Sequence, residues 1–265
     1  MIDLHCHLLP GIDDGTEDAE EAIDLASQLT TAGVHTVAAT PHLRDDHPAV
    51  RAEELAGRCS ELSEALRAAG IGLEVVPAAE VDLVRALEAT DQELRLASYG
   101  GRGTDILLEA PYGPLPTSFE EQVFRLSVRG YRILLAHPER NPTLKGDPGR
   151  LYELVRRGVL LQVTGDSLLP RRTRSRTVDL ARSLVAEGVA HVIASDAHGP
   201  RGPSREPLSA GVAEARELAG AYADWMVEDA PAAILAGQPL PAPPELGGRS
   251  GRGLRGRLKW RGRRD

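Results

Sequence analysis

The chain has 265 residues, a hydrophobic share of 42% and a formal net charge of −8 at pH 7. This composition is ordinary for a folded protein and excludes disorder as the state of the whole chain. Two cysteines, Cys6 and Cys59, give no disulfide framework and favour a reducing compartment. We find no signal peptide and no uncharged apolar run of roughly 18 residues, so we expect a cytoplasmic protein.

The C-terminal segment carries a charge opposite to that of the rest of the chain. Residues 247–265 contain eight Lys and Arg and one acid, a net charge of +7, which leaves residues 1–246 at −15. An acidic body argues against nucleic-acid binding by the globular part, including its active site. Because residues 238–265 are rich in Pro, Gly and Arg, we predict a flexible tail there. This tail could touch an anionic membrane or nucleic acid, or serve only to keep the protein soluble.

Short apolar segments alternate with amphipathic segments along residues 1–237. The apolar segments are typical of buried parallel strands and span residues 1–6, 35–40, 73–79, 105–108, 131–136, 159–164 and 191–195. The amphipathic segments predict helices at residues 19–31, 51–69, 118–129, 148–157 and 177–187. Seven strands that alternate with helices indicate an α/β fold in which one parallel, barrel-like sheet forms a single domain.

Histidine and acidic residues follow the ends of these predicted strands. They are His5, His7, His42, Glu80, Glu109, His137, Asp196 and His198, with Asp13 and Asp14 in the first loop. Any one of them alone is more often a surface residue or a helix cap than a ligand. In a barrel, however, the carboxyl ends of the strands meet at one mouth, and buried ionisable groups are costly unless they are paired or bind metal. The set therefore predicts a metal site.

The kinds of side chain in this set indicate which metals it could hold. Imidazole and carboxylate ligands without thiolates suit Mn²⁺, with Fe²⁺ or Zn²⁺ as alternatives, in a hydrolytic site. About nine ligands exceed the coordination of one ion, so we predict two or three divalent ions.

These motifs resemble those of the polymerase-and-histidinol-phosphatase (PHP) superfamily, through His5-x-His7, His42, the Glu80 and His137 segments, and Asp196-x-His198. More narrowly, residues 1 to about 236 resemble the capsule-type bacterial protein-tyrosine phosphatases. The resemblance implies a distorted (β/α)₇ barrel, the PHP fold, with a trinuclear metal site. By position it implies the ligands His5, His7, Asp14, His42, Glu80, Glu109, His137, Asp196 and His198, with Asp13 as the alternative to Asp14.

The same resemblance assigns phosphate binding to Arg140 and Arg205. A guanidinium group meets two phosphate oxygens at once, so arginine suits this role. The segment after His198 is about two residues longer than the family pattern, which makes Arg201 an alternative to Arg205. Arg44 is a further candidate, since it follows His42 closely.

The predicted reaction is hydrolysis of a phosphomonoester by attack of a metal-bridging hydroxide. Phosphotyrosine on a protein is the favoured substrate, and the implied partner is a membrane-bound bacterial tyrosine kinase of exopolysaccharide synthesis. Two alternatives are a small-molecule phosphatase, such as a histidinol-phosphate phosphatase, and a non-catalytic metal-binding regulatory module.

Overall fold

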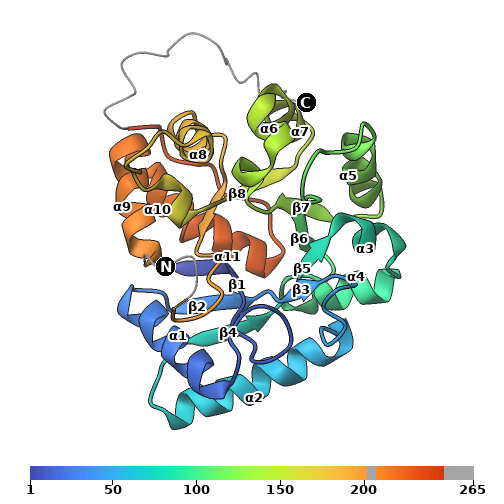
Figure 1. The fold of residues 1–265 in the computed structure, drawn as a ribbon, viewed down its shortest axis with the longest axis vertical. Coiled ribbons are helices and arrows are strands. Elements are labelled where there is room, and N and C mark those ends of the chain that lie inside the picture. Colours follow the sequence, from blue (N-terminus) through green and yellow to red (C-terminus); the bar gives the residue numbers. More distant parts are fainter. Residues whose placement is uncertain (202–206, 248–265) are drawn as a thin grey trace.

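The structure is a computed structural model that describes residues 1–201 and 207–247. Figure 1 shows strands in the middle of the molecule with helices around them. In the described residues the strands pair in parallel, in one sheet ordered β1-β2-β4 and one ordered β3-β5-β6-β7-β8-β9. The strands are β1 (Ile2–Cys6), β2 (Thr36–Ala39), β3 (His42–Leu43), β4 (Glu74–Pro77), β5 (Glu80–Asp82), β6 (Asp105–Glu109), β7 (Arg132–Leu135), β8 (Leu160–Thr164) and β9 (Val192–Ala194).

The two sheets are parts of one curled barrel. β2 leads into β3 across residues 40–41, and β4 leads into β5 across residues 78–79, so each pair occupies one strand position. At the closing edge the backbone N–H of Asp196 donates to the carbonyl of His5 at 2.8 Å, which brings β9 beside β1. The described strands thus occupy seven positions, and the predicted distorted (β/α)₇ barrel is confirmed. The two interruptions were not predicted.

Helices surround the barrel in chain order (Figure 1). The helices are α1 (Ala19–Thr31), α2 (Leu55–Ala68), α3 (Leu83–Glu88), α4 (Asp91–Ala97), α5 (Phe119–Val128), α6 (Pro142–Gly146), α7 (Gly149–Arg156), α8 (Arg176–Ala186), α9 (Leu208–Ala219), α10 (Tyr222–Trp225) and α11 (Asp229–Ala236). Short 3₁₀ turns occur at η1 (Ala52–Glu54), η2 (Tyr99–Gly101), η3 (Pro138–Arg140) and η4 (Gly165–Leu168). Among the described residues, no helix combines the length and the apolar character needed to span a membrane.

The five predicted helices correspond to α1, α2, α5, α7 and α8, with ends that differ by at most four residues. The other helices were not predicted. Several of them, such as α3, α6 and α10, are only four to six residues long. So short a segment gives little helical periodicity in the sequence.

Apolar side chains form two core clusters. The larger cluster includes helix residues such as Leu25 and Phe119 and lies between the helices and the barrel. The smaller cluster joins strand residues such as Leu4 and Leu134 to Ile234 of α11. The segment before α11 meets the start of β1, where the backbone N–H of Ile2 donates to the carbonyl of residue 227 at 2.7 Å. The second cluster therefore fills the barrel, and α11 closes its amino-terminal end.

Residues 238–247 follow α11 without helix or strand. The backbone N–H of Gly247 donates to the carbonyl of Ala219 at 3.1 Å. Leu246 lies so close to Gly188 that a Cβ added there would be 3.2 Å from its Cδ1. This segment thus ends near the start of β9, at the same end of the barrel as α11. The remaining part of the predicted tail, residues 248–265, lies outside the described residues.

Candidate metal centre

All nine predicted ligands lie in one cluster at the carboxyl ends of the strands. His5 is on β1, His42 on β3, Glu80 on β5 and Glu109 on β6, while His7, Asp14, His137, Asp196 and His198 lie in the loops that follow β1, β7 and β9. Side-chain N and O atoms within 4.8 Å of one another define four overlapping groups: His7, Asp14, His42 and His198; His5, His137 and Asp196; His5, His7 and Glu80; and His42, Glu80 and Glu109. Together the four groups contain all nine residues.

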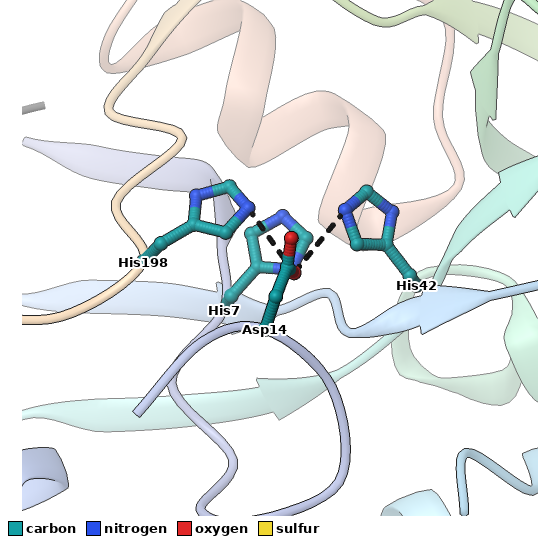
Figure 2. Close-up of side chains that lie close together, drawn as sticks. All are labelled: His7, Asp14, His42 and His198. Atoms are coloured by element: carbon teal, nitrogen blue, oxygen red, sulfur yellow. Dashed lines mark ion pairs between the residues drawn. The ribbon is translucent and has the colours of Figure 1, made fainter. Parts of the chain in front are cut away.

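The first group lies nearest to solvent. Figure 2 shows the imidazoles of His7, His42 and His198 around the Asp14 carboxylate. Asp14 Oδ1 is 3.5 Å from Nε2 of His42 and 3.5 Å from Nε2 of His198. The side chain of Asp14 is 54% exposed, whereas that of His42 is 3% exposed. Asp14 therefore covers the cluster from the outside.

Glu80 lies at the centre of the cluster and is fully buried. Its Oε2 is 3.0 Å from Nδ1 of His42 and 3.2 Å from Nε2 of His5, and its Oε1 is 2.8 Å from Nε2 of His137. Within the described chain Oε2 nevertheless has no hydrogen bond of acceptable geometry. A buried carboxylate oxygen that several imidazole nitrogens surround in this way has the position expected of an oxygen that bridges metal ions.

Three imidazoles are oriented so that Nε2 faces the cluster. Nδ1 of His5 bonds to Gln162 Oε1 at 3.1 Å, Nδ1 of His7 to Asp13 Oδ2 at 2.7 Å, and Nδ1 of His198 to a backbone carbonyl at 3.0 Å. Each partner is an acceptor, so each Nδ1 carries the hydrogen and Nε2 can offer its lone pair. This arrangement is usual for histidines that bind metal. The donor set therefore fits divalent metal ions.

Charge within the cluster shifts the pKa values of its members. Burial alone would lower the pKa of His137, but the Glu80 carboxylate raises it to about 9. Burial would raise the pKa of Glu80, but the surrounding imidazoles hold it well below its ordinary value. Burial, together with neighbouring His7, lowers the pKa of His198 to about 4. Cations are thus favoured at the inner carboxylates, and metal ions would displace the protons that His137 otherwise holds.

Two supporting residues connect ligands that are far apart in the sequence. Asp13 Oδ2 accepts from His7 and also from the backbone N–H of His42 at 3.0 Å. Gln162 Oε1 accepts from His5 and from the backbone N–H of His137 at 3.2 Å. The sequence left Asp13 as an alternative ligand, and it gave Gln162 no role. The sequence feature that could have indicated a role for Gln162 is its amide side chain within the otherwise apolar start of strand β8.

Backbone strain occurs at two of the candidate ligands. His137 has φ = 30° and Asp196 has φ = 52°, and they are the only described non-glycine residues with positive φ. Each is the second residue after the end of a barrel strand, β7 for His137 and β9 for Asp196. Such conformations cost about 1–3 kcal/mol each and persist where the surrounding structure enforces them, often at functional sites.

Arg140 is the predicted phosphate-binding residue that the structure places at the cluster. It lies on η3, and its Nη1 is 2.5 Å from Asp196 Oδ2. A cavity of about 300 Å³ is lined by Arg140, Tyr112 and five of the candidate ligands: Asp14, His42, His137, Asp196 and His198. The side chain of Arg140 is 41% exposed, so its guanidinium is accessible to a ligand in this cavity.

The other candidate arginines are placed differently. Arg44 donates from Nη1 to Glu109 Oε2 at 3.1 Å, and its Cζ lies 5.1 Å from the ring centroid of Tyr112. Arg201 is 78% exposed and pairs with Glu21 at 2.5 Å. Arg205 lies outside the described residues. Tyr112, which the sequence analysis did not single out, is 74% exposed at the mouth of the cavity.

A parallel barrel with imidazoles and carboxylates gathered at the carboxyl ends of its strands defines the class of metal-dependent α/β-barrel hydrolases. The family model for capsular polysaccharide synthesis proteins, CpsB/CapC, matches residues 1–236. The chain therefore belongs to the CpsB/CapC family, as its motifs predicted.

Individual relatives agree with this assignment. The chain is 34% identical to tyrosine-protein phosphatase YwqE of Bacillus subtilis over 202 residues, or 75% of this chain and 77% of that protein. It is 24% identical to tyrosine-protein phosphatase CpsB of Streptococcus pneumoniae over 207 residues, or 75% of this chain and 83% of that protein.

Solved structures show the same fold. A chain from the crystal structures of YwqE and CpsB, described as metal-dependent tyrosine phosphatases, matches with a TM-score of 0.79 and 29% identity. This match covers 94% of our chain and 100% of the other. A lactonase from Listeria monocytogenes, with a TM-score of 0.50 and 11% identity, shares the barrel alone.

Proposed function

We propose that this protein is a metal-dependent phosphatase that hydrolyses phosphotyrosine on proteins. The observation that carries the proposal is the cluster of nine imidazoles and carboxylates with Arg140 on the same cavity. YwqE and CpsB, to which the chain is similar, are named tyrosine-protein phosphatases, and this supports the same reaction. Neither Cys6 nor Cys59 offers a thiolate nucleophile, because burial raises the pKa of both thiols.

The cluster is proposed to hold two or three divalent ions, because nine ligands exceed what one ion accepts. Mn²⁺ is the proposed metal, with Fe²⁺ or Zn²⁺ as alternatives for the same donors. When bound, such ions would supply a water-derived nucleophile at neutral pH and would neutralise charge on the phosphate oxygens. Glu80 would help to hold more than one ion, because it is the only one of the four candidate carboxylates that belongs to two of the groups, one with His5 and one with His42.

Arg140 is proposed to bind and orient the phosphate. Its ion pair with Asp196 holds the guanidinium at the edge of the cavity and leaves further N–H donors for phosphate oxygens. A planar guanidinium can hold two of those oxygens at once, which fixes the direction of the leaving oxygen. Arg205, or Arg201 in its place, stays a proposal for the second phosphate contact.

Tyr112 supports an aromatic leaving group. Its exposed ring forms one wall of the cavity that contains the ligands, and the Arg44 guanidinium lies against the ring. Arg44 also donates a hydrogen bond to Glu109, so its side chain links the Tyr112 ring to a candidate metal ligand. A phenyl ring of phosphotyrosine beside Tyr112 would gain about 0.5–1.5 kcal/mol from the aromatic contact.

A substrate panel with metal-reconstituted protein tests the proposal. We expect phosphotyrosyl peptides to be hydrolysed faster than phosphoseryl peptides and histidinol phosphate. Excess EDTA should abolish activity, and Mn²⁺ should restore it best. Tyr112→Ala should lower the preference for the phosphotyrosyl peptide several-fold, while Tyr112→Phe should keep it.

Three other outcomes of these experiments would contradict the proposed function. A preference for histidinol phosphate would indicate a small-molecule phosphatase. Full metal content without turnover of any substrate would indicate a non-catalytic regulatory module. Full activity in excess EDTA would contradict the metal-dependent mechanism.

The proposed setting is the cytoplasm, and the proposed partner is a membrane-bound tyrosine kinase of exopolysaccharide synthesis. The family's link to capsular polysaccharide synthesis supports this partner. Residues 248–265 contain eight basic residues and one acid, so they are proposed to contact anionic membrane near such a kinase. Binding of the full chain to anionic vesicles, with and without this segment, tests the idea.

A further inference from the structure

The segment from the end of η4 to the first turn of α8 is strongly basic. Residues 167–178 contain four arginines and no acid, although residues 1–246 as a whole carry a net charge of −15. The four arginines, Arg171, Arg172, Arg174 and Arg176, are all exposed, and we refer to them as the basic rim. A local excess of positive charge on an acidic protein is unexpected from composition alone.

The basic rim reaches, through Arg171, a cleft that opens onto the metal cluster. The lining of this cavity of about 290 Å³ includes Arg171 and its ion-pair partner Asp166, together with Arg140, Asp196 and His198. Arg140 also lines the cavity over the candidate metal ligands, so the two cavities meet at this side chain. A substrate whose phosphate contacts Arg140 can therefore extend directly toward the rim.

Three of the rim arginines have partners within the chain, and one of these, Arg176, donates from Nη2 to the backbone carbonyl of Lys145 at 3.2 Å. Arg174 pairs with Asp179 at 2.9 Å, with side chains that are 89% and 50% exposed, and Arg171 pairs with Asp166. Arg172 has no hydrogen bond or ion pair with any residue that the structure describes. Ion pairs at the protein surface stabilise a fold only slightly, so an incoming anion can replace the present partners at small cost.

We propose that the basic rim binds acidic groups that flank the phosphotyrosine, so that the substrates are acidic phosphotyrosyl segments. This inference rests on the proposed function. An extended peptide advances about 3.3 Å per residue, so residues next to the phosphotyrosine come within reach of a cleft beside Arg140. Carboxylates and a second phosphate share the required chemistry, since arginine binds both through charge-assisted hydrogen bonds.

Charge attraction of this kind raises the rate of encounter and lowers KM more than it changes kcat. It also weakens as salt shortens the Debye length from about 10 Å at 0.1 M to about 3 Å at 1 M. A membrane surface could also attract the rim. The position of Arg171, in the same cavity as Arg140, favours a substrate instead.

The experiment measures kcat/KM for three matched phosphotyrosyl peptides: one flanked by Asp and Glu, one with Asn and Gln at those positions, and one with a second phosphotyrosine. We expect the full-length, metal-loaded protein to favour the acidic and doubly phosphorylated peptides by about tenfold at low salt, mainly through KM. The preference should largely disappear in 1 M NaCl. A difference between the two anionic peptides shows which anion the rim prefers.

The test variant replaces Arg171, Arg172 and Arg174 by glutamine, and its readout is the ratio of kcat/KM between acidic and neutral peptides. That ratio cancels any general loss of activity, and we expect it to fall to within about twofold of one. The matched control replaces three exposed arginines outside the cleft, Arg125→Gln, Arg156→Gln and Arg157→Gln, and should keep the tenfold ratio.

Two results would overturn the inference: no preference in the parent protein, or a preference that the rim variant keeps. Loss of binding to phosphatidylserine vesicles in the rim variant, with the peptide preference intact, would make the rim a membrane contact instead. If the parent hydrolyses no phosphotyrosyl peptide at all, the proposed function fails, which is a distinguishable result.

Discussion

The two ends of the barrel are built from the same strands but carry opposite kinds of side chain. At the carboxyl ends, five imidazoles and three further carboxylates gather around Glu80. At the amino ends, α11 covers the barrel with apolar residues, and Ile234 belongs to the same core cluster as Leu4 and Leu134.

Because of this difference, one end of the barrel serves metal binding and catalysis, and the other serves stability of the fold. The carboxyl end keeps buried charges together and contains two strained residues, His137 and Asp196, all of which costs stability. The amino end buries apolar area and thereby offsets that cost. Substitutions at the carboxyl end should therefore impair metal binding and catalysis, whereas substitutions at the amino end should impair folding.

The largest effect is expected for His137→Ala at the carboxyl end. Because this change removes a candidate metal ligand, metal content should fall, and kcat/KM should drop by at least about a thousandfold. Metal analysis and steady-state kinetics measure both quantities. The matched control is His35→Ala, which removes a 59% exposed histidine outside the cluster and should alter neither. Unchanged metal content in His137→Ala would contradict its role as a ligand.

At the amino end, Ile234→Ala should lower the free energy of unfolding by about 2–5 kcal/mol, because it leaves a cavity beneath α11. Metal content per folded chain and kcat/KM should stay close to those of the parent protein. Denaturant unfolding provides the measurement. Val84→Ala, at a 55% exposed position, is the control and should change stability by less than about 0.5 kcal/mol. A large loss of metal in folded Ile234→Ala would mean that the two ends are not separate.

Arg140→Ala should separate substrate binding from metal binding at the carboxyl end. Loss of a charge-assisted phosphate contact should cost about 2–4 kcal/mol in the transition state, or about 30- to 1,000-fold in kcat/KM. Metal content should stay unchanged, unlike in His137→Ala. Arg140→Lys should recover only part of the rate, because an ammonium group cannot bind two oxygens in parallel. Parental kinetics in Arg140→Ala would make Arg44 and Arg201 the next residues to test.

His191 provides a pH test of the amino end. It precedes β9, and its Nδ1 accepts the backbone N–H of Leu161 at 3.2 Å. Burial lowers the pKa of His191 from 6.5 to about 4, so the folded state binds this proton less readily than the unfolded state. Stability should therefore be complete above pH 6.5 and should decrease by about 1–3 kcal/mol as the pH falls to about 4.

Urea unfolding at a series of pH values measures this effect. His191→Asn keeps an acceptor near the position of Nδ1 but does not titrate, so its stability should change less between pH 6.5 and 4. Identical pH curves for the two proteins would exclude His191 as the source.

The smallest effect is expected from deletion of residues 248–265. The described chain ends at Gly247, which is bonded to Ala219 at the amino-terminal end of the barrel, far from the metal cluster. Turnover of a small aryl phosphate should change by less than about twofold, while binding to anionic vesicles should weaken. A large loss of turnover would place the tail at the active site and remove the contrast between the two ends.

Much of the barrel and of the candidate site could be predicted from the sequence. Short apolar runs such as residues 131–136 are typical of strands buried on both faces, and their alternation with amphipathic helices indicates a parallel sheet. In a parallel barrel all carboxyl ends meet, so residues that follow these strands, such as His137 and Asp196, were predicted to lie together. The interruption between β2 and β3 was not predicted, because an apolar run shows strand character but not where its pairing changes sheet.

Only the tertiary structure decided the partners of the buried polar groups. His5 bonds to Gln162, 157 residues away, and Asp196 pairs with Arg140. The tertiary structure also placed Tyr112 at the cavity and brought Arg44 into a hydrogen bond with Glu109. Patterns along a sequence report which face of a strand or helix is buried, because buried residues recur with the period of that element. The choice of partner depends on distances between segments that meet only when the barrel closes, and no local pattern encodes those distances.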